Sequence, residues 1–374
     1  MTIPHFHTFR YFTISNIRRR KKYRNGIYFS NIYCKFAKKK ETMPDCSDIL
    51  WNDIVNDFGK EILELLLVDQ SVTVAKNDGK THHIFWATND YEARGKGYGF
   101  HDEIEVEAIT DENCHVVMPR VLKRKELQRK RVKDKAEIFT PSWVCNFMVN
   151  NLDERFFGFR EVFNKEINNR HNWVVNQSKI EMPEGKTWQE FVKIRWMEYC
   201  CGEAPFIVSR YDTTTGETIP IESRIGFLDR KLRIVSENTT SEEEWLEGAR
   251  MAYQNTLGNE WAGDSLLLAR ENLLYTFAEY FAHRFGHQPT HEWLRIIADI
   301  ISWNIMQMDG LKLVVPDTCH DVVTTNLLGE KEVHPCPGCK AHDARKHNGI
   351  PVLVKSWSTG LAVPLRMCLK SNRK

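Results

Sequence analysis

The sequence predicts an α/β fold, in which a larger domain of alternating helices and strands follows a small α+β domain. From Ser241 onward, apolar residues at helical spacing alternate with short strand-like stretches, as in a parallel sheet covered by helices. The stretch 197–206 places Gly202 and Ala204 after an apolar run, which is typical of a strand ending in a tight turn beside a ligand. A plain strand-to-helix turn is the alternative. We therefore expect ligand-binding loops at the carboxyl ends of the strands.

Composition indicates a globular protein. The chain has 374 residues, of which 42% are hydrophobic and 27% are charged, so it is long enough for two domains. No apolar run approaches about 18 residues, so we expect no membrane partner. The ten cysteines are scattered and no secretory signal is visible. These features predict a cytoplasmic protein with free thiols.

Charge and composition divide the chain into five segments. Residues 1–40 contain eleven Lys or Arg and no Asp or Glu, whereas the remainder is acidic. Four interpretations of this leader remain open. It is an arm that binds nucleic acid, an Arg-rich transit peptide, a disordered tail, or sequence upstream of a true start at Met43. The expected segments are a basic leader over 1–42, a small α+β domain over 43–122, a basic linker helix and the start of the next helix over 123–152, the main α/β domain over 153–330, and a Cys/His-containing tail over 331–374.

In the small domain, the sequence predicts one helix followed by strands. Apolar residues recur at helical spacing over Ser47–Leu67. A hairpin turn signal, Asn77-Asp78-Gly79, separates two strand-like stretches. The strands are expected over Ser71–Ala75, His82–Ala87, Glu103–Ile109 and Cys114–Val121.

The linker Lys123–Lys135 holds eight basic residues against two acids. On a helix, these side chains would lie along the phosphates of double-stranded DNA. The alternative is a solvated linker helix. The candidate DNA-binding residues are Arg129, Lys130, Arg131 and Lys133.

Ahead of the main domain, a helix capped by Thr140 is expected, with Pro141 as its first residue. A polar connection with a short helix near Trp188 leads to the turn at Gly202. An insertion of short strands and turns is then expected over Arg210–Asn238. Helices are expected over Ser241–Tyr253, Asp264–Phe285 and Thr290–Ile301. The expected strands are a strand end over Leu257–Trp261, a strand over Asn304–Leu311, and a closing hairpin over Val352–Leu369.

Four motifs follow one another as in a known family. They are Phe139-Thr140-Pro141, Glu198–Phe206, Glu260 with Ala269–Leu273, and Asn304–Leu311. Their order resembles that of gamma-class adenine-specific (N6) DNA methyltransferases, the modification subunits of restriction–modification systems. Gly202–Asp212 also resembles a subgroup labelled restriction endonuclease subunit M. The resemblance covers roughly residues 43–349.

The resemblance implies a Rossmann-like sheet that binds S-adenosyl-L-methionine. We expect this sheet to be incomplete at its C-terminal side, because few residues follow Asp309. The resemblance implies that the methionine portion of the cofactor is bound by Glu198, Gly202, Ala204 and Thr140. Glu260 would bind the ribose hydroxyls, and Asp309 would bind the adenine amino group.

Two departures from the family keep alternatives open. Ala204 replaces the more usual second Gly, and Glu260 lies farther from Gly202 than is usual. Asp229 and Glu237 are therefore rival ribose ligands. The alternative for Asp309 is an acid that closes a turn.

The family transfers a methyl group to an exocyclic amine of a base flipped out of the duplex. An Asn-Pro-Pro-aromatic motif normally holds that amine, and this sequence contains no such tetrapeptide. The nearest candidate, Asp321–Leu328, offers Asn326 as the catalytic residue but lacks both prolines and the aromatic residue. Chance similarity is the alternative.

The tail contains two Cys and two His in a tight cluster, enough in number for tetrahedral zinc ligation. The candidate ligands are Cys336, Cys339, His342 and His347. A Cys-Pro-Gly-Cys turn without metal is the alternative.

The function expected from the resemblance is adenine-N6 methylation of DNA by a bacterial or phage-encoded subunit, with a restriction or specificity subunit as partner. One alternative is a non-catalytic subunit that binds the cofactor or DNA, and another is a protein glutamine N-methyltransferase. Because the motif for the target amine is missing, we expect the isolated chain to bind the cofactor but to transfer methyl groups poorly.

Overall fold

A parallel sheet forms the centre of the computed structural model, which describes residues 10–12, 51–135, 137–326 and 330–368. The strand order is β1-β4-β5-β6, with β1 (Arg10–Phe12), β4 (Trp196–Tyr199), β5 (Thr256–Glu260) and β6 (Ile305–Gln307) all parallel. The mixed α/β fold predicted from the sequence is confirmed in this coarse form. Nearly all of the expected leader, and Met43, lie outside the described residues.

Both faces of the sheet are buried. Neighbouring strand residues point to opposite faces, and Trp196 and Ile305 join a large core that includes residues of α8, α9, α10 and α11. Met197, Leu257 and Met306 join a second core, which residues of the C-terminal segment complete. Such double covering is usual for parallel strands.

The helices that connect the strands are α8 (Phe227–Asn238), α9 (Glu242–Gln254), α10 (Gly263–Phe285) and α11 (His291–Asn304). Ser241 caps α9 by accepting from the backbone N–H of Glu244. The helices expected after Ser241 are thereby confirmed. The expectation of short strands over Arg210–Asn238 is wrong for its second half, because α8 buries an apolar face there.

The N-terminal region is helical rather than α+β. It contains α2 (Trp51–Phe58), α3 (Lys60–Leu67) and α4 (Gln70–Lys76), followed by the 3-10 turns η2 (Glu92–Arg94), η3 (Val106–Ala108), η4 (Asp111–Asn113) and η5 (Arg120–Leu122). The strand expected over Ser71–Ala75 is wrong, because Asp69 accepts from the Val72 N–H at 2.9 Å and starts α4. The other three expected strands are reduced to isolated bridges or turns.

The segment before β4 contains α5 (Lys125–Lys135), α6 (Ser142–Phe157), the antiparallel pair β2 (Asn164–Ile167) and β3 (Asn172–Val175), and α7 (Trp188–Val192). The expected cap of α6 by Thr140 is wrong by one residue, since Pro141 occupies the N-cap position. Asp212 replaces the missing cap, because its Oδ2 accepts from the Ser142 N–H at 2.7 Å.

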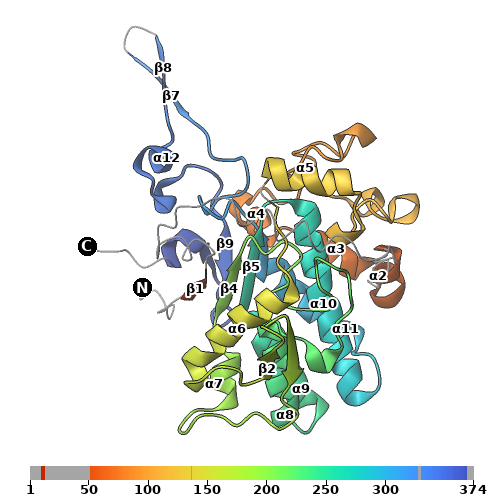
Figure 1. Ribbon diagram of the computed structural model, residues 1–374. Coiled ribbons are helices and arrows are strands. Elements are labelled where there is room, and N and C mark those ends of the chain that lie inside the picture. Colours follow the sequence, from red (N-terminus) through yellow and green to blue (C-terminus); the bar gives the residue numbers. More distant parts are fainter. Residues whose placement is uncertain (1–9, 13–50, 136, 327–329, 369–374) are drawn as a thin grey trace.

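The C-terminal segment forms two hairpins. Strands β7 (Val322–Thr325) and β8 (Lys331–His334) pair antiparallel, and Figure 1 shows them projecting from the body of the molecule beyond α12 (Pro337–Ala341). After η7 (Ala344–Lys346), β9 (Leu353–Lys355) pairs with β10 (Ala362–Pro364) ahead of η8 (Leu365–Cys368), which confirms the closing hairpin. The expected boundary between residues 330 and 331 falls between the two strands of the projecting hairpin.

None of the helices in the described ranges is both long enough and apolar enough to cross a membrane.

Candidate functional site

A cavity of about 910 Å³ lies where β4 and β5 end. The turn after β4, the end of β5 and the segment before α6 line it with Glu198, Gly202, Glu260, Phe139 and Thr140. Ligands of open α/β sheets bind at this edge, outside the carboxyl ends of the strands. The structure therefore brings to one cavity four of the residues predicted to bind the cofactor, together with Phe139 of the first motif.

The turn after β4 is tightly coiled. Cys200, Gly202 and Ala204 have φ values of 56°, 56° and 65°, in the left-handed region. Ala204 thus occupies a conformation that favours glycine, the residue usual at this position in the resembling family. Backbone bonds tie the turn to β5, since the Cys201 N–H donates to the Asn259 carbonyl at 2.8 Å.

Glu260 joins the end of β5 to this turn. Its Oε2 accepts from the Gly202 N–H at 2.8 Å, and its Oε1 accepts from the Trp261 N–H at 2.8 Å. Burial raises the pKa of Glu260, while these N–H donors oppose the shift. Oε1 also accepts from the Ala262 N–H at 3.4 Å. A carboxylate oxygen can accept two hydrogen bonds, so Oε2 can still accept one from a ligand hydroxyl.

Glu198 lies beside Glu260 but is bound differently. Its Oε2 is buried and has no hydrogen-bond partner among the described residues. Burial raises the pKa of Glu198 well above its ordinary value, and the negative charge of Glu260 raises it further. A cationic ligand would supply the missing partner and favour the ionised carboxylate.

Aromatic rings supply the apolar surface of the cavity. Phe139 and Trp261 belong to its lining together with Phe100, Phe206 and Phe227. Arg120 stacks 5.0 Å from the Phe139 ring centroid, and the Trp261 Nε1–H donates to the Ala87 carbonyl at 3.2 Å. Trp261 was not singled out from the sequence, although it directly follows Glu260.

Carboxylates outnumber cations at the cavity. Two basic residues line it, Lys130 and Arg131, and both form ion pairs. The acidic side chains of the lining are Asp90, Asp134, Glu137, Glu198 and Glu260. This balance favours a ligand that carries positive charge.

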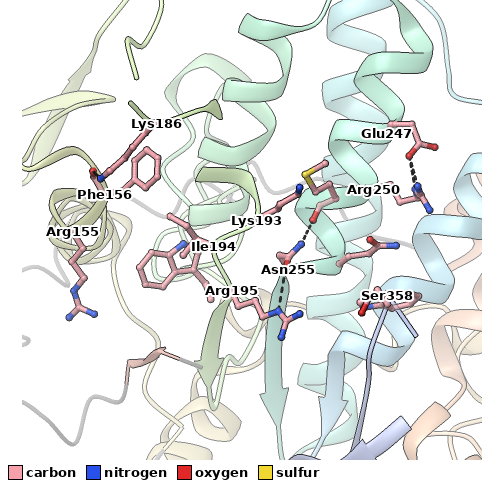
Figure 2. A pocket seen from close by; sticks show the side chains of 14 residues that line it. Arg155, Phe156, Lys186, Lys193, Ile194, Arg195, Glu247, Arg250, Asn255 and Ser358 are labelled. Carbon is pink, nitrogen blue, oxygen red and sulfur yellow. Dashed lines mark hydrogen bonds and ion pairs between the residues drawn. The ribbon is translucent and has the colours of Figure 1, made fainter. Parts of the chain in front are cut away.

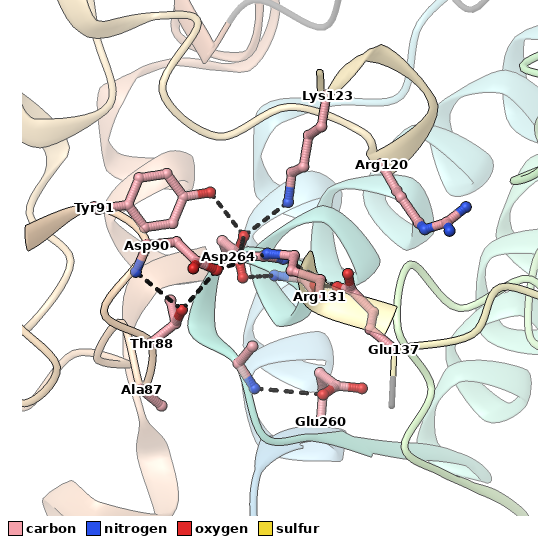
Figure 3. Close-up of polar contacts among 12 residues, drawn as sticks. Ala87, Thr88, Asp90, Tyr91, Arg120, Lys123, Arg131, Glu137, Glu260 and Asp264 are labelled. Atoms are coloured by element: carbon pink, nitrogen blue, oxygen red, sulfur yellow. Dashed lines mark hydrogen bonds and ion pairs between the residues drawn. The ribbon is translucent and has the colours of Figure 1, made fainter. Parts of the chain in front are cut away.

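The expectation that Arg131 contacts DNA is wrong. Arg131 is 1% exposed and donates to Asp90 at 2.8 Å and to Asp264 at 2.5 Å (Figure 3). Asp264, in the first turn of α10, also accepts from Lys123 and Tyr91. Arg131 therefore has a structural role, in which its ion pairs hold α5 against α10. The other three candidates on α5, Arg129, Lys130 and Lys133, are exposed.

Asp309 is not among the described residues that line the cavity. Its Oδ1 accepts from the backbone N–H groups of Leu311 and Lys312 at 2.9 and 3.1 Å, so it closes the turn after β6. The rival ribose ligands are also engaged elsewhere. Asp229 accepts from Ser209 and Gly226, and Glu237 accepts from Ile180 and Arg233.

Asn326 lies at the end of β7, and the structure does not bring it to the cavity. Its side-chain amide donates to Glu330 Oε2 at 2.9 Å and accepts from the Glu330 N–H at 3.0 Å. It therefore closes the projecting hairpin. The chain leaves the central sheet after β6 and pairs β7 with β8 instead, so Asn326 lies away from the sheet.

The Cys/His cluster of the tail has a different membership from the one expected. Cys336, Cys339 and His347 come together, and the fourth member is Cys319. His342 is exposed at the end of α12, outside the cluster. Sequence reasoning missed Cys319 because it lies before the hairpin, far from the other ligands along the chain.

A second hollow of about 780 Å³ lies at the opposite end of the strands, beside the start of β4 (Figure 2). Its basic residues are Arg155, Lys186, Lys193, Arg195 and Arg250. Several are engaged locally, since Arg250 pairs with Glu247 and Lys186 lies over the Phe156 ring. The carboxyl-end cavity is the stronger candidate because it holds a buried carboxylate oxygen without a partner among the described residues.

Comparison of the chain with models of protein families, with curated proteins and with solved structures gave no match. The function must therefore be inferred from the chemistry of the cavity.

Proposed function

We propose that this chain binds S-adenosyl-L-methionine in the carboxyl-end cavity and acts as a subunit of an adenine-N6 DNA methyltransferase of a restriction–modification system. The observation that carries the proposal is the pair Glu198 and Glu260. They stand on neighbouring parallel strands and line one cavity, and Glu198 has a buried oxygen without a partner in the described part of the chain.

The residues present fit this cofactor chemically. Its ammonium and sulfonium groups are positive, which suits a cavity with more carboxylates than cations. Glu260 is suited to ribose hydroxyls, as carboxylates at the ends of strands are in dinucleotide folds. The rings of Phe139 and Trp261 offer flat apolar surface for an adenine. About 910 Å³ is within the usual size range of cofactor pockets.

When bound, S-adenosylmethionine supplies an electrophilic methyl group, and the chain must then hold the target amine in line with it. Among the described residues that line the cavity, Asn89 carries the one side-chain amide. It is exposed at the rim, and the Phe100 ring belongs to the same lining. We assign to Asn89 the acceptor role expected of Asn326, with Phe100 as a stacking face for the base.

Position favours DNA as the substrate. Lys130 and Asp134 of α5 line the cavity, so this basic helix runs past it and one of its exposed cations lies at the cavity. A duplex held along α5 would place a flipped base near the cavity. A glutamine side chain of a protein substrate would gain nothing from this basic helix.

Isothermal titration calorimetry with S-adenosylmethionine tests the assignment. Glu260→Gln should lose a charge-assisted hydrogen bond, which costs roughly 1.5–3 kcal/mol, or about 10- to 150-fold in affinity. Asp309→Asn is the matched control, because Asp309 bonds only within its own turn in the described structure. Equal affinity of Glu260→Gln and wild type, or a larger loss in Asp309→Asn, would contradict the assignment.

A further inference from the structure

Four ligand-type side chains meet below the projecting hairpin, away from the cofactor cavity. Cys319 precedes β7, Cys336 and Cys339 flank the start of α12, and His347 follows η7. Their sulfur atoms and one imidazole nitrogen all lie within 4.8 Å of one another. Cys336 and His347 are buried, and Cys319 and Cys339 are partly exposed.

The distances in this cluster match the edges of a metal tetrahedron. Zn–S bonds of about 2.3 Å and Zn–N bonds of about 2.0 Å give tetrahedral edges of about 3.8 Å between sulfurs and about 3.5 Å between sulfur and nitrogen. Cys319 Sγ and Cys339 Sγ are 3.7 Å apart. His347 Nδ1 lies 3.4, 3.6 and 3.7 Å from Cys319, Cys336 and Cys339 Sγ. A disulfide would instead bring two sulfurs to about 2.0 Å.

We propose that Cys319, Cys336, Cys339 and His347 form a structural zinc site. Three thiolates and one imidazole in tetrahedral arrangement suit Zn²⁺ among the biological metals. Four protein ligands close the coordination sphere, which is typical of structural rather than catalytic zinc. The site does not depend on the proposed methyltransferase function.

The surroundings support the ligand positions. The Asn348 N–H donates to Cys336 Sγ at 3.4 Å, a contact that stabilises a thiolate. Gly338 allows the closest approach, because a Cβ there would lie 2.6 Å from the His347 ring. The Asn348 side chain also donates to the His320 carbonyl at 2.7 Å, which ties the Cys319 segment to the His347 segment.

The site would clamp both ends of the projecting hairpin. β7 begins shortly after Cys319 and β8 ends shortly before Cys336. Most residues of the two strands are exposed, and a lone two-stranded hairpin is at best marginally stable in water. A metal that joins the ends would hold the hairpin in place without an apolar core.

Metal analysis of the purified full-length chain tests the proposal. Wild type is expected to contain close to one zinc per chain, and Cys319→Ser should contain well below half of that. His342→Ala and Cys368→Ser are matched controls that keep wild-type zinc, because both residues lie outside the cluster. Cys319→Ser is the sharpest variant, since a site built from the tail motif alone would not need it.

Cobalt substitution tests the site in the wild-type protein, so its result does not depend on whether a variant folds. Wild type loaded with Co²⁺ should show thiolate-to-cobalt charge transfer and the visible bands of tetrahedral Co²⁺. Chelation should make the 322–334 hairpin newly sensitive to limited proteolysis, while the sheet stays resistant. Wild type that binds neither zinc nor cobalt under reducing conditions would overturn the proposal, as would zinc that survives Cys319→Ser but is lost in His342→Ala.

Discussion

Two carboxylates at the ends of β4 and β5 differ in what holds them. Glu260 is fixed by backbone N–H groups from the turn and from the start of the next segment. Glu198 has a buried oxygen with no partner in the described structure. An ionised carboxylate in that position is costly in the free chain, so Glu198 is the residue whose state should change most when a cationic ligand binds.

Glu198→Gln should therefore bind S-adenosylmethionine more weakly yet be more stable without it. Above the ordinary pKa of 4.5, the folded wild type keeps a proton that the unfolded chain has lost, so its stability falls as pH rises towards the raised pKa. Glutamine removes that fall. The stability gain of the variant should therefore grow as pH rises above that ordinary value.

Thermal unfolding of both proteins across this pH range measures the gain, and calorimetry measures the affinity. Cofactor affinity of wild type should also rise with pH, whereas that of Glu198→Gln should lack this dependence. A variant that is less stable than wild type at every pH would show that Glu198 is ionised and satisfied in the free chain.

Arg131→Gln should destabilise the fold rather than weaken DNA binding selectively. Burial alone would raise the pKa of Asp264, but the charges of Lys123 and Arg131 outweigh it and hold that pKa well below its usual range. Removing one partner of a buried ion pair costs roughly 3–5 kcal/mol. Urea denaturation measures this loss, and Arg129→Gln on the same helix should stay within about 0.5 kcal/mol of wild type. Similar midpoints for both variants would contradict the structural role of Arg131.

Sequence reasoning found residues whose role depends on their place in a strand or turn, and missed those defined by distant contacts. Glu198, Gly202 and Glu260 lie at or just after the ends of two strands, so their meeting at one edge could be predicted. Arg131 could not be told from its exposed neighbours, because its partners Asp90 and Asp264 are remote in sequence. The inclusion of Cys319 in the cluster likewise depends on the path of the chain between residues 319 and 336.

At the scale of elements, long periodic helices were predictable and short ones were not. The spacing of apolar residues over α10 and α11 identifies them directly. In α4, by contrast, β-branched residues favour a strand, but the Asp69 cap and packing of Val72 into the second core override that preference. The region 82–121 alternates like strands, yet tertiary contacts form single bridges there rather than ladders.

The exposed face of α5 should determine nonspecific binding to DNA. Replacing Arg129, Lys130 and Lys133 together by Gln should weaken duplex binding for all sequences alike, since phosphate contacts carry no base information. The slope of log affinity against log salt should fall by roughly 0.9 for each phosphate that the variant no longer neutralises. Fluorescence anisotropy with a labelled duplex at several salt concentrations measures the slope. No change in slope would leave α5 as a solvated linker helix and favour a protein substrate.

At the scale of the molecule, residues of the C-terminal segment help to cover one face of the sheet. The C-terminal residues Val352, Val354 and Leu365 fill the second core, and Leu353 N–H donates to Ser71 Oγ of α4 at 2.8 Å. The hairpin β9–β10 and Leu365 therefore pack on the main body, while hairpin β7–β8 projects from it (Figure 1). Because Asn326 lies on that hairpin, the proposed function requires an acceptor for the target amine from elsewhere, either from the cavity rim or from a partner chain.

Methyl transfer by this chain should accordingly depend on Asn89 and not on Asn326. We expect the isolated chain to bind S-adenosylmethionine but to methylate unmodified DNA poorly, with turnover rising when a partner subunit holds the flipped base. Misplacing a reacting group by about 1 Å can cost on the order of 100-fold in rate, so Asn89→Ala should lose at least that much of whatever turnover is measured. Asn326→Ala is the matched control, because that side chain bonds to Glu330 in the hairpin.

The variants are compared by the transfer of labelled methyl groups to DNA, with and without neighbouring gene products. Cofactor binding by both variants must stay at the wild-type level, so that a loss of turnover reports on the acceptor alone. Turnover that survives Asn89→Ala and disappears in Asn326→Ala would return the acceptor role to the hairpin. Cofactor binding without transfer under any condition would make the chain a binding subunit.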